Sequence, residues 1–216
     1  MHTVTLAEAR SKALLAAHGV PVASEQVVSD ADGAVRAASA MGPRVVVKLN
    51  GDRIAHKTER GLVRLGLDSE AAVRRAAEEL LAAATPDDGD VSLIVAKYVK
   101  GNRELIAGVV VDPQLGPAVM LGIGGIFAEA LGDVAFRLAP LDHIDAHELI
   151  DDLTSQAVLG ELRGEPAVDR EALADVLLAL SACVEAHPEI VSIDVNPLIV
   201  SGGMPIAVDA LVEVTG

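Results

Sequence analysis

The sequence has few aromatic residues and a single cysteine. Tyr98, Phe127 and Phe136 make up all of its Phe, Tyr and Trp among 216 residues. This scarcity argues against a single-strand nucleic-acid binder, which stacks bases on aromatic side chains. Cys183 is alone, which excludes an intramolecular disulfide and a cysteine metal cluster. Its place in an apolar predicted helix indicates a small buried side chain rather than a nucleophile. The core must therefore be built from alanine, valine, leucine and isoleucine.

Basic residues are also in the minority. Seventeen Lys and Arg face thirty-two Asp and Glu, a formal net charge of −15. Such a surface repels phosphate backbones and anionic lipids, which argues against generic binding to nucleic acids or membranes. The apolar stretch 105–128 carries one charge, but its five glycines and two prolines would break a membrane-spanning helix. The N-terminus lacks the pattern of a signal peptide, so we expect a soluble, cytoplasmic protein.

Hydrophobic periodicity and turn residues predict an α+β chain of two lobes. The expected strands cover residues 24–28, 44–49, 62–67, 91–99, 104–111, 117–121, 190–195 and 205–211. The expected helices cover residues 5–19, 29–41, 69–84, 145–152, 154–159 and 169–187. A turn signal at residues 100–102 indicates the lobe boundary. We therefore expect an N-terminal helix at 1–20, a small lobe at 21–99 and a large lobe at 100–216.

A cationic stretch covers residues 44–64. It contains six Lys or Arg side chains and only two acids, although the chain as a whole is acidic. Lys48 lies near the end of an apolar strand, where burial disfavours its charge unless an anion is close. Positive side chains beside Gly51 and Gly61 would suit a polyphosphate. A solvated loop, with Lys48 reaching the surface, is an equally weighted alternative.

His56 lies inside this loop. A single histidine is more often a polar surface or packing residue. Neighbouring cations, however, favour the neutral and nucleophilic imidazole, which could accept a phosphoryl group. The residues alone leave both interpretations open.

A glycine turn, Gly122-Ile-Gly-Gly125, follows a predicted strand. Glycines let a backbone approach a ligand and leave N–H groups available for an anion. The spacing is not the dinucleotide fingerprint, because no glycine falls three residues after Gly124 and no βαβ unit surrounds the turn. A glycine turn without a binding function is equally compatible with this pattern.

Two acids and an asparagine lie near the C-terminus in otherwise apolar strands. Asp194 and Asn196 are two residues apart on a strand and so point to the same face. A hairpin about residues 201–204 would bring Asp209 near Asn196. One amide and one carboxylate oxygen leave room for water and phosphate around Mg²⁺. We favour this metal site over an Asn-Pro turn with a capping aspartate.

Taken together, these motifs resemble the nucleotide-binding (beta) subunit of ADP-forming acyl-CoA synthetases, an ATP-grasp family related to succinyl-CoA synthetase. The resemblance runs in order along nearly the whole chain. The segments that carry it are Val47-Lys48, His56-Lys57-Thr58, Gly61, Glu104, Gly108, Asp112-Pro113, Gly116-Pro117, Gly122-Ile-Gly-Gly125, Glu129, Asp133, Phe136-Arg137, Pro140-Leu141, Gly160, Arg163-Gly164, Asp194-Val-Asn-Pro-Leu198 and Val208-Asp209-Ala210.

The resemblance implies an ATP-grasp fold with ATP or ADP held between two α+β lobes, and the reaction acid + CoA + ATP ⇌ acyl-CoA + ADP + phosphate. It implies that His56 relays the phosphoryl group and that Asp194 supports the phosphohistidine. It further implies that Asn196 and Asp209 hold Mg²⁺. The residues expected to bind the nucleotide are Lys48, Gly61, Lys97, Tyr98, Val99, Glu104, Gly124, Gly125 and Arg137.

The chain departs from the family pattern in three ways. Ser192 stands where the family often has a glutamate, so one acidic contact would be missing. Lys97-Tyr98 stands where a Gln-Glu-like pair is common. The CoA-binding portion is absent, so we expect a separate or fused CoA-binding alpha subunit and a homo- or hetero-oligomer. The alternatives are an ATP-grasp carboxylate ligase without phosphohistidine and a non-catalytic nucleotide-sensing module.

Overall fold

The computed structural model describes residues 2–54, 57, 60–125 and 132–216, and the chain divides into two compact units. Unit 1 consists of Met1–Leu6, Ser11–Val22 and Val99–Gly216, and unit 2 consists of Ala7–Arg10 and Ala23–Tyr98. Helix α1 (Glu8–Ala17) therefore contributes its first turn to unit 2 and its remaining residues to unit 1.

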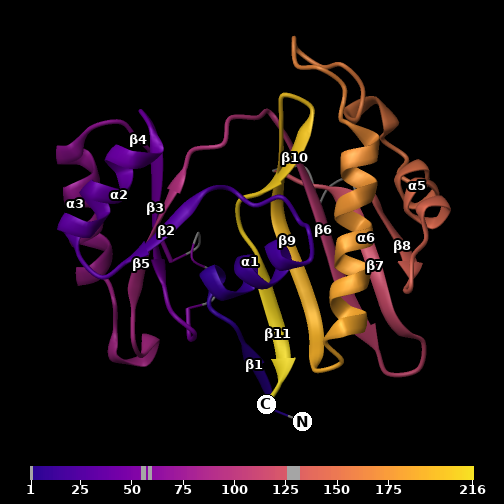
Figure 1. The fold of residues 1–216 in the computed structure, drawn as a ribbon, viewed down its shortest axis with the longest axis horizontal. Helices are drawn as coiled ribbons and strands as arrows, with labels where there is room; N and C mark the ends of the chain where they lie inside the picture. Colours follow the sequence, from indigo (N-terminus) through magenta and orange to yellow (C-terminus); the bar gives the residue numbers. More distant parts are fainter. Residues whose placement is uncertain (1, 55–56, 58–59, 126–131) are drawn as a thin grey trace. The chain divides into compact units, whose positions relative to one another are not determined.

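Unit 2 contains a four-stranded antiparallel sheet and two helices (Figure 1). In sheet order the strands are β2 (Glu25–Val28), β5 (Ser92–Lys97), β3 (Val45–Asn50) and β4 (Val63–Leu67). The helical segments are α2 (Ala31–Met41), α3 (Glu70–Ala82) and the short 3-10 turn η1 (Pro86–Asp88). Asp30 and Ser69 cap the two helices by accepting a first-turn N–H. Every residue of β3 is buried, so this strand forms the centre of the small core.

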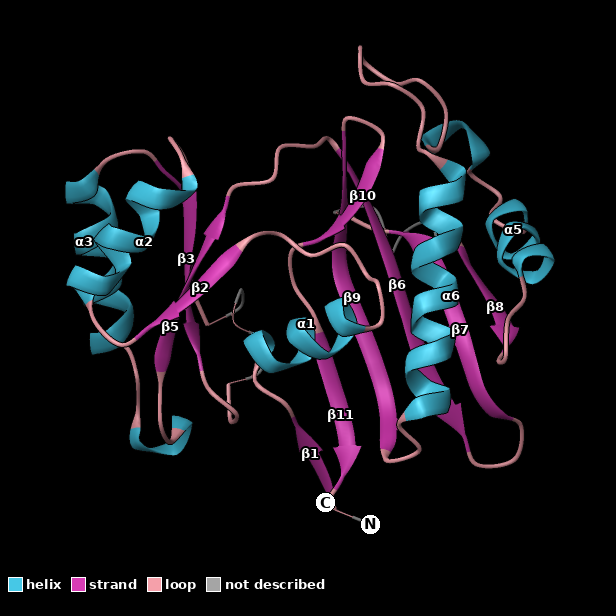
Figure 2. Ribbon diagram, in the orientation of Figure 1, coloured by secondary structure: helices cyan, strands magenta, loops and turns pink. Residues whose placement is uncertain are grey.

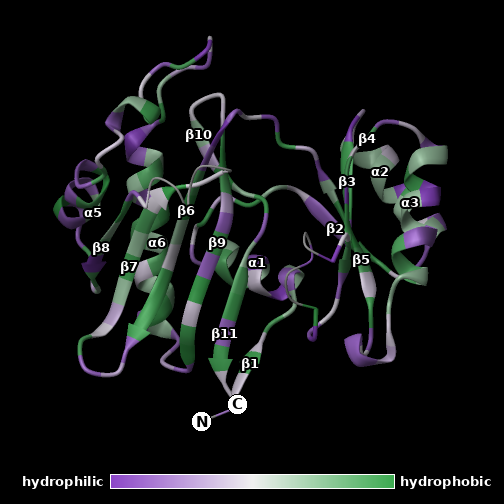
Figure 3. Ribbon diagram, turned by 180° about the vertical axis from the view of Figure 1, so that it is seen from behind, coloured by the Kyte–Doolittle hydropathy of each residue, from purple (hydrophilic) through white to green (hydrophobic). Residues whose placement is uncertain are grey.

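Unit 1 contains a seven-stranded antiparallel sheet in the order β1-β11-β9-β6-β7-β8, with β10 paired to β9. Its strands are β1 (Thr3–Thr5), β6 (Arg103–Asp112), β7 (Gly116–Ile123), β8 (Val134–Leu138), β9 (Ile190–Ser201), β10 (Met204–Ala207) and β11 (Leu211–Thr215). Helices α5 (His143–Asp151) and α6 (Arg170–Ala186) lie on one face of this sheet (Figures 2 and 3), and the 3-10 turn η2 (Gln156–Val158) precedes α6. Leu173, Leu177 and Leu180 of α6 are fully buried in the core of this unit.

Most of the predicted strands and helices are confirmed, and the differences have local causes. The strand expected at 205–211 is two strands, because residues 208–210 separate β10 from β11. In this gap the Val208 N–H donates to the Pro197 carbonyl. The helix expected at 5–19 begins at Glu8, because Thr3–Thr5 pairs with β11. Strands β1 and β8 are absent from the prediction, since short edge strands depend on their partners more than on their own pattern.

The apolar stretch 105–128 contributes to a hairpin rather than to a long helix. Residues 105–112 of β6 pair with residues 116–123 of β7, and the turn falls at Pro113 to Leu115. No helix within the described residues combines the length and apolarity that crossing a membrane requires.

The close packing of β6 against β9 predicts that a substitution at Gly108 lowers the stability of the chain. A Cβ at Gly108 would lie 2.2 Å from the Ile193 carbonyl oxygen, so β6 and β9 could pair only after a shift. We expect Gly108→Ala to lower the free energy of unfolding by about 1–3 kcal/mol, the usual cost of overpacking. Urea unfolding followed by circular dichroism measures this in a chain without tryptophan. Gly160→Ala is the control, because its Cβ would meet only ordinary contact at 3.5 Å, and equal losses in both variants would contradict the packing argument.

Candidate functional site

Lys48 is a buried cation whose anion comes from the start of α1. It lies on β3, where its neighbours Val47 and Leu49 are fully buried, and Lys48 itself is only 6% exposed. Its Nζ donates a hydrogen bond of 2.8 Å to Oε1 of Glu8, whose side chain is completely buried. The ammonium therefore does not reach the surface, and the buried anion that its position requires is Glu8.

Two described cations after β3, Lys57 and Arg60, are held by acids that are distant in the sequence. The Lys57 Nζ donates to Oε2 of Glu8 at 2.5 Å. Arg60 makes two hydrogen bonds to Asp88, and these hold the pKa of that buried carboxyl well below its ordinary range. The local excess of positive charge is thus compensated by carboxylates from other elements. His56 lies outside the described residues.

Gly61 ends this loop in the left-handed region, with φ of +66°. Its carbonyl accepts a hydrogen bond from Arg64, and Arg64 also forms an ion pair with Glu79 of α3. Gly61 therefore has a conformational role that only glycine fulfils without strain.

The residues expected near the adenine lie at the end of β5. Lys97 is exposed, whereas Tyr98 and Val99 are half-buried. The Tyr98 N–H donates to the Arg44 carbonyl, and the Arg44 guanidinium lies 5.7 Å from the centre of the tyrosine ring. This cation–π contact holds the chain at the last residue of unit 2.

Glu104 lies against the glycine turn within unit 1. The Gly124 N–H donates to the Glu104 carbonyl at 2.8 Å, and a Cβ at Gly124 would lie 3.1 Å from the same backbone. Gly125 has φ of +79°, and a Cβ added at this position would lie 3.7 Å from the Glu104 carboxylate. The expectation that these glycines leave their N–H groups free for an anion is therefore wrong for Gly124, whose N–H completes the pairing of β6 and β7.

Arg137 on β8 is held by helix α5. Its guanidinium donates to Glu148 and Asp152, and these contacts raise the pKa of Arg137 above its ordinary value. The geometry gives this arginine a structural role, fastening α5 to the sheet edge.

Asp194, Asn196 and Asp209 come together on unit 1. Alternation along β9 exposes Asp194 and Asn196 on one face of the strand. β10 pairs with β9 from Ala207↔Leu198 outward, and β11 pairs again at Leu211↔Asp194, so Asp209 lies opposite Asn196. The predicted hairpin is confirmed, and Asp209 reaches β9 as expected.

The carboxylates of Asp194 and Asp209 repel one another. Reduced hydration raises the pKa of Asp194 above its ordinary value, and the negative charge of Asp209 raises it further. Among the described residues, no three His, Cys, Asp or Glu side chains form a metal-binding group. Two carboxylates and one amide nevertheless fit Mg²⁺, which usually takes one or two protein carboxylates and completes its shell with water and phosphate.

Ser192 has a carboxylate beside it despite replacing an acidic residue of the family pattern. It pairs with Glu213 of β11, and its hydroxyl donates to Oε2 of Glu213 at 2.7 Å. An acidic side chain therefore lies beside this position, supplied by the adjacent strand.

Sequence reasoning missed Glu8, Asp88 and Glu213 as parts of these arrangements. The lysine partners of Glu8 are 40 and 49 residues away in the sequence, so no local pattern connects them. The available signal was the buried position of Lys48, which demands an anion without identifying it.

Comparison with known proteins gives a match over almost the entire chain. The profile of the ATP-grasp domain family matches residues 2–214. The chain is 36% identical over 208 residues to the acetate–CoA ligase [ADP-forming] I subunit beta of Pyrococcus furiosus, covering 95% of this chain and 90% of that protein.

Solved structures show the same similarity. Dinucleotide forming acetyl-coenzyme A synthetase 1 of Ca. Korarchaeum cryptofilum, in complex with coenzyme A, Ca-AMPCP and HgCl+, matches with a TM-score of 0.91 and 32% identity over 98% of this chain and 94% of that chain. A further structure of that synthetase holds coenzyme A and Mg-AMPPCP, with its phosphohistidine segment pointing towards the nucleotide binding site. It matches with a TM-score of 0.82 and 33% identity, over 96% of this chain and 92% of that chain.

Because the pKa of Asp194 is raised, we expect the difference in stability between the wild type and Asp194→Asn to depend on pH. The folded state holds this proton more tightly than the unfolded state, so the wild type loses stability as pH rises from the ordinary carboxyl pKa of 3.8 through the raised value. We expect Asp194→Asn to stabilise the metal-free protein at pH 7, by less than about 1 kcal/mol for a partly exposed pair.

Thermal unfolding at pH 7 and below pH 3.8 measures this difference, which should vanish at the lower pH. Asp175→Asn is the control, because that aspartate is exposed on α6 and away from this strand. Destabilisation of Asp194→Asn at pH 7 would contradict the repulsion between Asp194 and Asp209.

Proposed function

This chain belongs to the ATP-grasp domain family, and from that premise we propose that it is the nucleotide-binding (beta) subunit of an ADP-forming acyl-CoA synthetase. Its fold is the α+β ATP-grasp fold expected from the sequence. The reaction is acid + CoA + ATP ⇌ acyl-CoA + ADP + phosphate. The observation that carries the proposal is the 36% identity to an ADP-forming acetate–CoA ligase beta subunit over 95% of this chain and 90% of that protein.

In this proposal Lys48 binds the nucleotide phosphates. Glu8 already holds its ammonium on the fully buried strand β3, so the position of the ammonium is set before the nucleotide binds. Lys97, Tyr98 and Val99 lie beside the adenine. Further contacts come from Gly61, Glu104, Gly125 and Gly124, the last through atoms other than its N–H, which already donates to the Glu104 carbonyl. Arg137 is left out of the nucleotide site, because α5 already holds its guanidinium.

Asn196 and Asp209 hold Mg²⁺ in this proposal. The repulsion between Asp209 and Asp194 supports this assignment, because a cation relieves it. When bound, Mg²⁺ neutralises charge on the phosphates during transfer. The residues of this chain keep the two carboxylates and the amide on one strand pair, so little reorganisation is needed for binding.

His56 accepts the phosphoryl group. A ring nitrogen of the neutral imidazole attacks the γ-phosphorus of ATP, the bond from that phosphorus to the bridging oxygen breaks, and ADP leaves with the electron pair. Asp194 is the acidic residue that supports the resulting phosphohistidine in this proposal. In the reverse direction ADP takes the phosphoryl group back and ATP forms.

A CoA-binding alpha subunit, separate or fused, completes the enzyme. The Pyrococcus furiosus relative is itself a subunit beta by name, which supports a second component. The acid and CoA are handled there, and this chain performs the nucleotide half of the reaction in a cytoplasmic homo- or hetero-oligomer.

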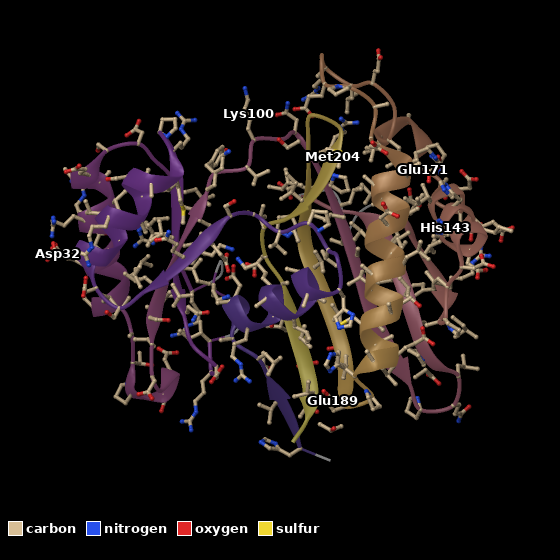
Figure 4. The ribbon with its side chains drawn as sticks, viewed as in Figure 1. Asp32, Lys100, His143, Glu171, Glu189 and Met204 are labelled. Carbon is tan, nitrogen blue, oxygen red and sulfur yellow. The ribbon has the colours of Figure 1, made fainter. Side chains whose placement is uncertain are left out.

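The phosphoryl transfer predicts a specific label. Incubation of the chain with Mg·[γ-³²P]ATP should place acid-labile phosphate on His56, and His56→Ala should abolish it. His143→Ala is the control, because His143 begins α5 on unit 1 (Figure 4) and should leave the label unchanged. A label that persists without His56 would exclude it as the acceptor. ATP binding without any label would instead favour a carboxylate ligase lacking phosphohistidine, or a sensing module.

The metal assignment predicts a metal-dependent loss of affinity. We expect Asp209→Asn to weaken Mg·ATP binding at least about tenfold, the scale of changes around metal ligands. Binding of metal-free ATP in EDTA should stay close to wild type. Calorimetric titration with and without Mg²⁺ measures both values. Equal losses in the two titrations would contradict a metal ligand at Asp209.

A further inference from the structure

Glu8 is a buried carboxylate whose two oxygens bind two different lysines. Oε1 accepts from Lys48 at 2.8 Å and Oε2 accepts from Lys57 at 2.5 Å. The Glu8 side chain has no exposed surface, and both lysine side chains are only 7% exposed. Burying three charges has a large desolvation cost that only good geometry repays. The arrangement therefore constrains the positions of all three side chains.

The backbone around Glu8 is fixed to the same loop. The Ala7 N–H donates to Oδ1 of Asp52, and the Ala9 N–H donates to Oδ1 of Asn50. Both acceptors lie at the end of β3 or just after it. These two side chains satisfy N–H groups at the start of α1, which have no partner within the helix. The first turn of α1 and the residue before it are thus hydrogen-bonded to the end of β3 and to the residues just after it.

The two lysines serve different parts of the proposed chemistry. Lys48 belongs to β3 and is the proposed phosphate ligand. Lys57 is the residue directly after His56, so its ammonium is the described anchor closest in sequence to the proposed phosphoryl acceptor. Through one carboxylate, Glu8 therefore connects the side chain that binds the phosphates to the segment that receives the phosphoryl group.

We propose that Glu8 is a positioning residue for phosphoryl transfer, which holds the ammonium groups of Lys48 and Lys57 in a fixed relation to one another. This inference rests on the proposed function. Glu8 does not touch the reacting atoms and acts through the two lysines. A glutamine has the same shape but only one acceptor oxygen, and its NH₂ group would face a lysine ammonium. Glu8→Gln therefore removes one of the two anchors and leaves the other.

The test separates the rate of phosphoryl transfer from the amount of folded protein. The full chain is mixed rapidly with saturating Mg·[γ-³²P]ATP, and the labelling of His56 is followed in time. The amplitude reports the fraction of competent chains, and the rate constant reports their geometry. We expect Glu8→Gln to lower the rate constant about 100-fold, the effect of a small misplacement of reacting groups. The amplitude should stay unchanged, and Glu8→Asp, which keeps the charge, should recover part of the rate.

Ser11→Ala is the matched control on the same helix. Ser11 is fully buried, its hydroxyl donates to the Leu6 carbonyl, and it accepts from the Val212 N–H, without any of the described contacts reaching the two lysines. It should lower the melting temperature and leave the labelling rate constant at the wild-type value. A wild-type rate constant in Glu8→Gln, or an equal loss of rate in Ser11→Ala, would overturn the positioning role.

A second variant decides the matter if Glu8→Gln does not fold. Lys57→Met keeps the Glu8–Lys48 pair and removes only the anchor beside His56, so it should also slow labelling while keeping the amplitude. An unchanged rate constant in Lys57→Met would overturn the inference. Absence of any label on the wild-type chain would overturn the proposed function itself, and the positioning role with it. Labelling of the wild type with no effect in either variant would overturn the positioning role alone.

Discussion

A charged lysine inside a fully buried strand is the constraint on which the proposed site depends. Lys48 cannot keep its charge on β3 without an anion, and the structure supplies Glu8 from the first turn of α1. Residues 7–10 belong to unit 2, and the same carboxylate also holds the Lys57 ammonium. The Glu8–Lys48 ion pair therefore serves both the fold and the proposed chemistry. In the proposed function, the carboxylate that stabilises the buried lysine also positions it for a phosphate.

Unit 1 brings two carboxylates, those of Asp194 and Asp209, close enough for their charges to interact. Antiparallel pairing of β9 with β10 and β11 places Asp209 opposite Asn196 and near Asp194. The sheet holds these groups together although their charges repel. In the proposed function, Mg²⁺ held by Asn196 and Asp209 relieves this repulsion.

The sequence predicted local features well and distant pairings poorly. Strand β3, the helices capped by Asp30 and Ser69, and the β9–β10 hairpin follow from periodicity, capping residues and turn glycines within a few positions. Glu8 with Lys48, Arg60 with Asp88, and Ser192 with Glu213 join residues 21 to 40 positions apart. Charge alone indicates that a partner is needed, but only the topology decides which acid supplies it. The positive loop therefore looked more available to a ligand in the sequence than it is in the structure.

The central claim is that this chain alone carries out the nucleotide half-reaction through a phosphohistidine. Exchange of radiolabel from ADP into ATP tests it most directly, because it requires reversible transfer to the protein and needs neither acid nor CoA. We expect the purified chain with Mg²⁺, ATP and labelled ADP to form labelled ATP, and His56→Ala to abolish this exchange. No exchange by the wild-type chain, or undiminished exchange by His56→Ala, would contradict it.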